Sequence, residues 1–94
     1  MQTSRGPDTT ALKLLTSAQI RAARALIRWS AQDLADASSV GVTTIRRAEL
    51  TASETKLTRV NDQAIRRTLE AAGVEFIDAD GGGPGVRLRQ AKNP

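Results

Sequence analysis

Residues 30–49 contain two short helical patterns separated by small residues, and this arrangement constrains the fold more than any other stretch. Ser30 is a good N-cap, and Asp33 stands three residues later, as in a capping box. Small, turn-prone residues at positions 38–41 interrupt the first pattern. A second short helix then opens near Val42. Two short helices joined in this way predict a helix-turn-helix over residues 30–49.

A longer helix is expected before this motif. Thr16 and Gln19 have the spacing of another capping box, which predicts a helix over residues 17–28. Apolar residues recur along it at helical spacing and are expected to face the core. Arg21 and Arg28 fall outside this stripe, so their side chains are expected to face water.

A fourth helix is expected over residues 62–72. Asn61 is a candidate N-cap, and Val60 with Ile65 has the spacing of a hydrophobic staple around that cap. Gly73 follows the last helical residue and is expected to end the helix in the left-handed conformation. The helices therefore form one unit over residues 16–73, preceded by a flexible tail over residues 1–15.

The C-terminal part changes from helical to strand-like patterning. Residues 74–77 are β-prone, and residues 86–89 alternate strictly between apolar and basic side chains. A glycine-rich turn separates the two segments. The sequence therefore predicts a β-hairpin over residues 74–90, followed by a short tail at residues 91–94. The expected fold class is mainly α, with four helices and a C-terminal β-hairpin.

The motif resembles the DNA-binding domains of lambda-repressor-like (XRE or Cro/CI type) bacterial regulators. Leu34-Ala35, Val40, Ile45 and Glu49 carry the resemblance by their spacing, and it covers roughly residues 16–77. Two positions depart from the family pattern. Ser39 replaces the glycine that is usual in the turn. Ala31 replaces a glutamine that often opens the first helix of the motif and contacts a phosphate.

The resemblance implies roles for particular side chains. The second helix of the motif would enter the major groove of DNA, which admits an α-helix with its side chains. Arg24 would pair with Glu49 and hold this helix in place. The residues expected to contact base edges are Val42, Thr43 and Arg47. The residues expected to contact the sugar-phosphate backbone are Ser30, Gln32, Thr44, Arg46, Lys56 and Arg59.

Composition limits the alternatives. The formal net charge is +4, and the chain contains no Cys and no His. A moderately basic balance favours a polyanionic partner, and the absence of thiols and imidazoles removes the commonest metal ligands and general bases. No catalytic residue, metal, cofactor or small-molecule ligand is expected. The sequence has no apolar run of about 20 residues that could span a bilayer, and no signal-peptide core, so a cytoplasmic location without membrane association is expected.

Two functional hypotheses follow, and an enzyme is the least favoured class. The first is a sequence-specific regulator of transcription, most simply a repressor, that binds double-stranded DNA at a roughly palindromic operator. A homodimer formed through the exposed edge of the C-terminal hairpin would suit such an operator. The second is a protein-interaction module of the same fold, such as an antitoxin or an anti-activator. Persistence of binding at high salt would distinguish the second from the first.

Overall fold

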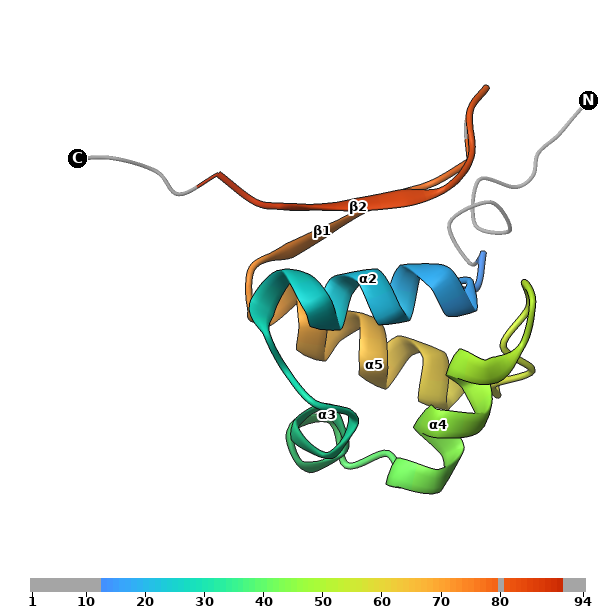
Figure 1. Ribbon diagram of the computed structural model, residues 1–94, viewed down its shortest axis with the longest axis vertical. Helices are drawn as coiled ribbons and strands as arrows, with labels where there is room; N and C mark the ends of the chain where they lie inside the picture. Colours follow the sequence, from blue (N-terminus) through green and yellow to red (C-terminus); the bar gives the residue numbers. More distant parts are fainter. Residues whose placement is uncertain (1–12, 80, 91–94) are drawn as a thin grey trace, which may run out of the picture.

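A computed structural model describes residues 13–79 and 81–90 of the chain (Figure 1). The described part contains four helices followed by an antiparallel hairpin, which confirms a mainly helical class with a C-terminal hairpin. The predicted tail at residues 91–94, and residues 1–12 of the N-terminal one, lie outside this part. The elements are α2 (Ser17–Ile27), α3 (Ala31–Ser38), α4 (Val42–Leu50), α5 (Arg59–Ala71), β1 (Val74–Ile77) and β2 (Gly85–Leu88).

Aliphatic side chains from every helix meet in one core. Helix α3 packs against α4 and α5, and α2 packs against α4 and both strands. The hairpin lies along α2 on the side away from α3, and β1 also contacts α5 (Figure 1). No helix within residues 13–79 and 81–90 is long and apolar enough to cross a membrane. The large apolar side chains that are almost completely buried are Leu15, Ile20, Leu34, Ile45, Ile65, Leu69 and Val74.

The starts of α2 and α3 confirm the two predicted capping boxes. The Thr16 hydroxyl accepts the N–H of Gln19, whose side-chain oxygen accepts the N–H of Thr16. Ser30 and Asp33 exchange the equivalent pair of hydrogen bonds, each 2.9 Å long. Each box satisfies N–H groups that a helix start otherwise leaves without a partner. These two helix starts therefore depend on residues only three positions apart.

The turn between α3 and α4 requires a left-handed residue. Ser39 adopts φ 65° and ψ 18° as the C-cap of α3. A side chain in this conformation costs roughly 1 kcal/mol, which glycine avoids. The serine at this position therefore carries a small strain, and the turn keeps its geometry in spite of it.

The start of α5 differs from the sequence prediction. The helix begins at Arg59, and its N-cap is Thr58, whose hydroxyl accepts the N–H of Asn61. Val60 is 76% exposed whereas Ile65 is buried, so the predicted staple between Val60 and Ile65 is wrong. The reason is that Asp62, which is 2% exposed, occupies the inward position and accepts the N–H of Leu15 at 2.9 Å.

The N-terminal tail also ends earlier than predicted. Leu15 is 2% exposed and belongs to the core, although the tail was expected over residues 1–15. Its backbone N–H is held by the buried carboxylate of Asp62. Burial raises the pKa of that carboxyl, and the hydrogen bond from Leu15 opposes the rise. The segment just before α2 is therefore part of the folded domain.

Gln19 joins the hairpin to the N-terminal end of α2. Strand β1 pairs with β2 in the register Phe76 opposite Val86 and Ile77 opposite Gly85. The side-chain amide of Gln19 donates to the carbonyl oxygens of both Ile77 and Gly85, at 3.2 and 3.1 Å. Its oxygen already accepts the N–H of Thr16. The whole hydrogen-bonding capacity of this amide nitrogen is used, which fixes the hairpin against the helix.

Candidate nucleic-acid interface

An ion pair holds the C-terminal end of α4 against α2. The guanidinium of Arg24 donates to both carboxylate oxygens of Glu49 at 2.7 Å, and a third nitrogen donates to the carbonyl of Trp29 at 2.8 Å. The Arg24 and Glu49 side chains are only 22% and 9% exposed. The hydrogen bonds that Arg24 donates to Glu49 raise the pKa of Arg24, so its guanidinium stays charged. The expected partner of Arg24 is thus the one found.

Arg21 adds a second tie to the same end of α4. Its guanidinium donates to the backbone carbonyl of Glu49, although this side chain was expected only to face water. The carbonyl groups of the last helical turn have no partner within the helix, and a positive charge near that end stabilises the helix. The buried hydroxyl of Ser17 also donates, at 2.7 Å, to the carbonyl of Thr51 just after α4. Helix α4 is therefore fixed from α2 by three side chains.

The opposite side of α4 faces solvent. Ile45 and Ala48 are buried in the core, whereas Thr43, Arg46 and Arg47 are exposed. Within the described residues, none of these three exposed side chains makes a hydrogen bond or an ion pair. Their donor groups are therefore available to a partner molecule.

The first turn of α4 is less exposed than the sequence suggested. Val42 was expected on the outward surface, but it is half-buried and packs against the core. Thr44 is also half-buried. Packing against the core covers part of the Val42 side chain. Only the remaining part of Val42 is open to a ligand.

A groove runs between α4 and the connection to α5. It has a volume of about 330 Å³ and contains two basic side chains among several hydroxyls. It brings together Arg47, Lys56 and Thr44 from the predicted set. Lys56 adopts φ 62°, an uncommon conformation for a residue with a side chain. The groove is lined by Thr44, Arg47, Ala48, Thr51, Thr55, Lys56, Leu57, Thr58 and Asn61.

The other predicted backbone contacts lie outside this groove. The Ser30 hydroxyl is used by the capping box of α3, and the amide of Gln32 donates to Asp36 at 2.9 Å. Arg46 and Arg59 are exposed on α4 and on the first turn of α5. These residues are accessible, but the groove does not gather them.

Sequence reasoning missed part of the groove. Thr51, Thr58 and Asn61 line it, but none of the three was expected to contact a ligand, and Asn61 was expected only to cap the next helix. Recognising Thr58 as the N-cap would have moved the start of α5 to the groove, because its spacing to Asn61 is that of a cap. No local pattern indicates Thr51.

The chemistry of this surface is donation of hydrogen bonds and positive charge. Among the described residues, no group of three His, Cys, Asp or Glu side chains is close enough to hold a metal ion. Guanidinium, ammonium and hydroxyl groups are suited to phosphate oxygens and to base edges. A scan against protein-family models and a search of curated proteins find no match for the chain.

Proposed function

We propose that the chain is a lambda-repressor-like, sequence-specific DNA-binding regulator that places α4 in the major groove of a double-stranded operator. The observation that carries the proposal is the exposed side of α4, where Thr43, Arg46 and Arg47 have no partner among the described residues. The helix is firmly held on its other side by Arg24 and Arg21. A rigid helix with free donors is what direct readout of bases requires.

Each exposed group has a distinct task in this proposal. Arg47 bridges the O6 and N7 atoms of a guanine, and Thr43 donates to a neighbouring base. The open part of Val42 contacts a thymine methyl group. Lys56, with Thr44 and Arg46, binds phosphate oxygens and sets the register of the helix without reading sequence. Gln32, Ser30 and Arg59 supply further backbone contacts.

Repression follows if the operator overlaps a promoter, and a homodimer explains a roughly palindromic site. The dimer forms by pairing of β2 with β2 of a second copy. The N–H of Arg89 donates to the carbonyl of Gly73, so these two residues form a hydrogen-bonded pair of the antiparallel ladder. Hydrogen-bonded and non-hydrogen-bonded pairs alternate along such a ladder, so the N–H and C=O groups of Val86 and Leu88 point away from β1. Leu88 is 52% exposed and would be covered by such pairing. Sedimentation of the full chain without DNA tests the dimer.

The central experiment is selection of bound duplexes from a random pool at about 150 mM salt. We expect an enriched sequence with two half-sites about one helical turn apart. Enrichment of a single half-site would retain the DNA-binding function and contradict the dimer. A pool that shows no enrichment over random duplex would contradict the function.

A second candidate function, masking of a protein partner, is favoured by a specific observation. Leu50 is 84% exposed at the end of α4, and Val60 is 76% exposed at the start of α5. Covering these two side chains with a protein partner would remove apolar surface from water, which favours such binding. Binding of a protein partner would persist in high salt, whereas binding of DNA weakens steeply with ionic strength.

A further inference from the structure

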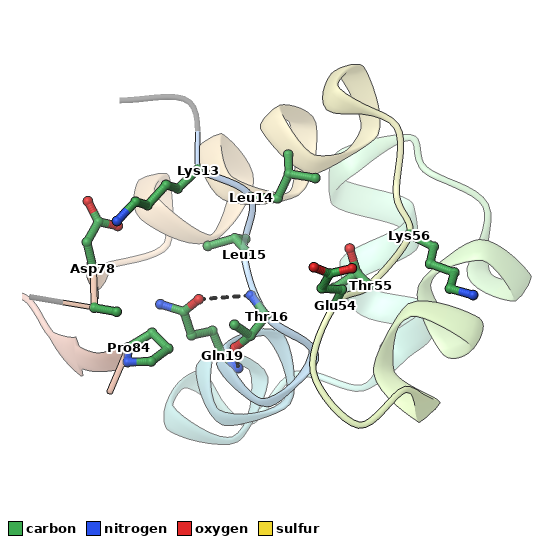
Figure 2. Close-up of a pocket in the computed structure, with 11 residues that line it drawn as sticks. Lys13, Leu14, Leu15, Thr16, Gln19, Glu54, Thr55, Lys56, Asp78 and Pro84 are labelled. Atoms are coloured by element: carbon green, nitrogen blue, oxygen red, sulfur yellow. Dashed lines mark hydrogen bonds between the residues drawn. The ribbon is translucent and has the colours of Figure 1, made fainter. Parts of the chain in front are cut away.

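A second cavity shares a wall with the groove beside α4. It has a volume of about 420 Å³ and lies between the segment before α2, the α4–α5 connection and the hairpin loop (Figure 2). Thr55 and Lys56 line both cavities. We call the second one the Leu14 cavity, after its 43% exposed leucine. Its volume is in the range of sites for small organic molecules.

The lining of the Leu14 cavity is mainly apolar. Leu14, Leu15, Ala79 and Pro84 contribute carbon atoms from two distant parts of the chain. The position of the wall is fixed by backbone contacts, because Thr16 and Glu54 form an antiparallel bridge and the N–H of Ser17 donates to the carbonyl of Ser53. The cavity is therefore held open by elements that are anchored to α2.

The charged residues around the cavity favour a cationic ligand. Figure 2 shows Lys13 beside Asp78 on one side, with Glu54 on the other. The side chain of Lys56 extends away from the cavity (Figure 2). Among the described residues, Glu54 takes part in no ion pair. A carboxylate beside apolar surface therefore remains without a counter-charge on the cavity side.

We propose that the Leu14 cavity binds a small organic cation, an ammonium group on an apolar body of about ten non-hydrogen atoms. The ammonium group pairs with Glu54 through charge-assisted hydrogen bonds, and the body packs against Leu14, Leu15 and Pro84. This site lies apart from the exposed face of α4, and Lys56 is the one proposed DNA contact among the residues that line it.

Binding of the cation in the Leu14 cavity would change the affinity for DNA at the groove on the other side of the shared wall. This part of the inference rests on the proposed function. Neutralising Glu54 removes a negative charge two residues from Lys56, a proposed phosphate contact. Electrostatic effects between exposed charges act over a screening length of about 10 Å at 0.1 M salt. The ligand is therefore expected to tighten DNA binding about fivefold, at the low end of typical coupling between sites.

The binding step is tested on the full chain by NMR titration with phenylpropylamine, in the absence of DNA. We expect shifts at the amides of Leu14, Thr55 and Ala79. Glu54→Gln should weaken the binding about tenfold, and Asp36→Asn, at an exposed carboxylate on α3, should leave it unchanged. Equal affinity for phenylpropionate, or an unchanged affinity in Glu54→Gln, would overturn the proposal. So would the absence of shifts at these amides at millimolar amine.

The coupling is tested by measuring DNA affinity with and without the amine at constant ionic strength. The wild-type chain should bind the selected duplex about fivefold more tightly with amine, and Glu54→Gln should bind more tightly without amine and show no further gain. An unchanged affinity in the presence of bound amine would refute the coupling. A chain that bound no duplex would refute the proposed function instead, and the NMR titration would still decide whether the cavity binds the amine.

Discussion

Arg24 and Glu49 form a two-pronged ion pair that connects α2 to the last turn of α4, with both N–O distances at 2.7 Å. The guanidinium of Arg24 makes a further hydrogen bond, which it donates to the carbonyl of Trp29. The pair lies at the inner side of the helix whose outer side carries the proposed DNA contacts. Its loss should therefore affect stability first and binding second.

Arg24→Ala should destabilise the domain by about 3 kcal/mol, because the nearly buried carboxylate of Glu49 loses its counter-charge. Urea unfolding measures the change. Replacing both partners, as in Arg24→Met with Glu49→Met, should recover much of the loss. Arg87→Ala is the matched control, because it breaks an ion pair with Glu75 that is exposed to solvent. It should leave the unfolding midpoint nearly unchanged. A double variant as unstable as Arg24→Ala would contradict this account.

Asp62 should make the stability fall as the pH rises. Burial raises the pKa of its carboxyl above the ordinary value of 3.8, so ionisation is harder in the folded than in the unfolded chain. Its contribution is fully present below that ordinary value and is lost as the pH rises through the raised pKa.

Asp62→Asn removes this titration and keeps an oxygen that accepts the N–H of Leu15. Unfolding of both proteins should be followed between about pH 3 and about pH 8. The variant should gain stability relative to the wild type as the pH rises. A relative gain of the wild type would mean that Arg66 and the helix end stabilise the ionised form more than burial disfavours it.

Ser39→Gly should stabilise the domain by about 0.5–1 kcal/mol, because Ser39 has a left-handed backbone at φ 65°. Ser38→Gly provides the opposite case. Ser38 is the last residue of α3, and its hydroxyl accepts the N–H of Val40. That variant should lose about 1 kcal/mol. Chemical denaturation of both proteins checks the two signs, and equal changes would argue against strain at Ser39.

Gln19→Glu should loosen the hairpin, because a carboxylate oxygen would face the carbonyls of Ile77 and Gly85 in place of the amide donors. We expect a loss of about 2 kcal/mol and faster hydrogen exchange at the hairpin amides. Gln63→Glu makes the same chemical change at a half-buried position on α5. Similar exchange rates in the two variants would show that the amide of Gln19 does not hold the hairpin.

Arg47→Ala should cost about 1–3 kcal/mol of binding at one base position and relax specificity there. Lys56→Ala should weaken all duplexes alike and reduce the slope of log affinity against log salt by about 1. Binding to the selected duplex and to random duplex, over a range of salt concentrations, separates the two effects. Equal losses on both duplexes for Arg47→Ala would contradict its reading role.

Short-range signals predicted the helical part well. The capping boxes of α2 and α3 involve residues three positions apart, so the sequence contains all the information they need. Asn61 was predicted as the cap of α5, whereas Thr58 caps the helix and Asn61 lies within it. The choice between them depends on Asp62, which is drawn inward by the N–H of a residue 47 positions earlier. A contact between residues so far apart in the chain produces no periodic pattern from which the sequence could predict it.

The candidate site was predictable to the same extent. Thr43, Arg46 and Arg47 follow from the helical period once α4 is recognised, and all three are exposed. The half-burial of Val42 depends on its packing against core side chains, most of which belong to other elements. Arg21 binds a carbonyl on another helix, and the sequence carries no local sign of that contact.

The absence of side-chain hydrogen bonds from Thr43, Arg46 and Arg47 within the described residues has an evolutionary consequence. Exposed positions that support no other group usually tolerate exchange within about 0.5 kcal/mol. Arg21, Arg24 and Glu49 carry the attachment of α4, and none of them belongs to its exposed side. Under the proposed function, drift at the outer positions can therefore change the preferred operator step by step while the attachment of α4 to the domain is kept.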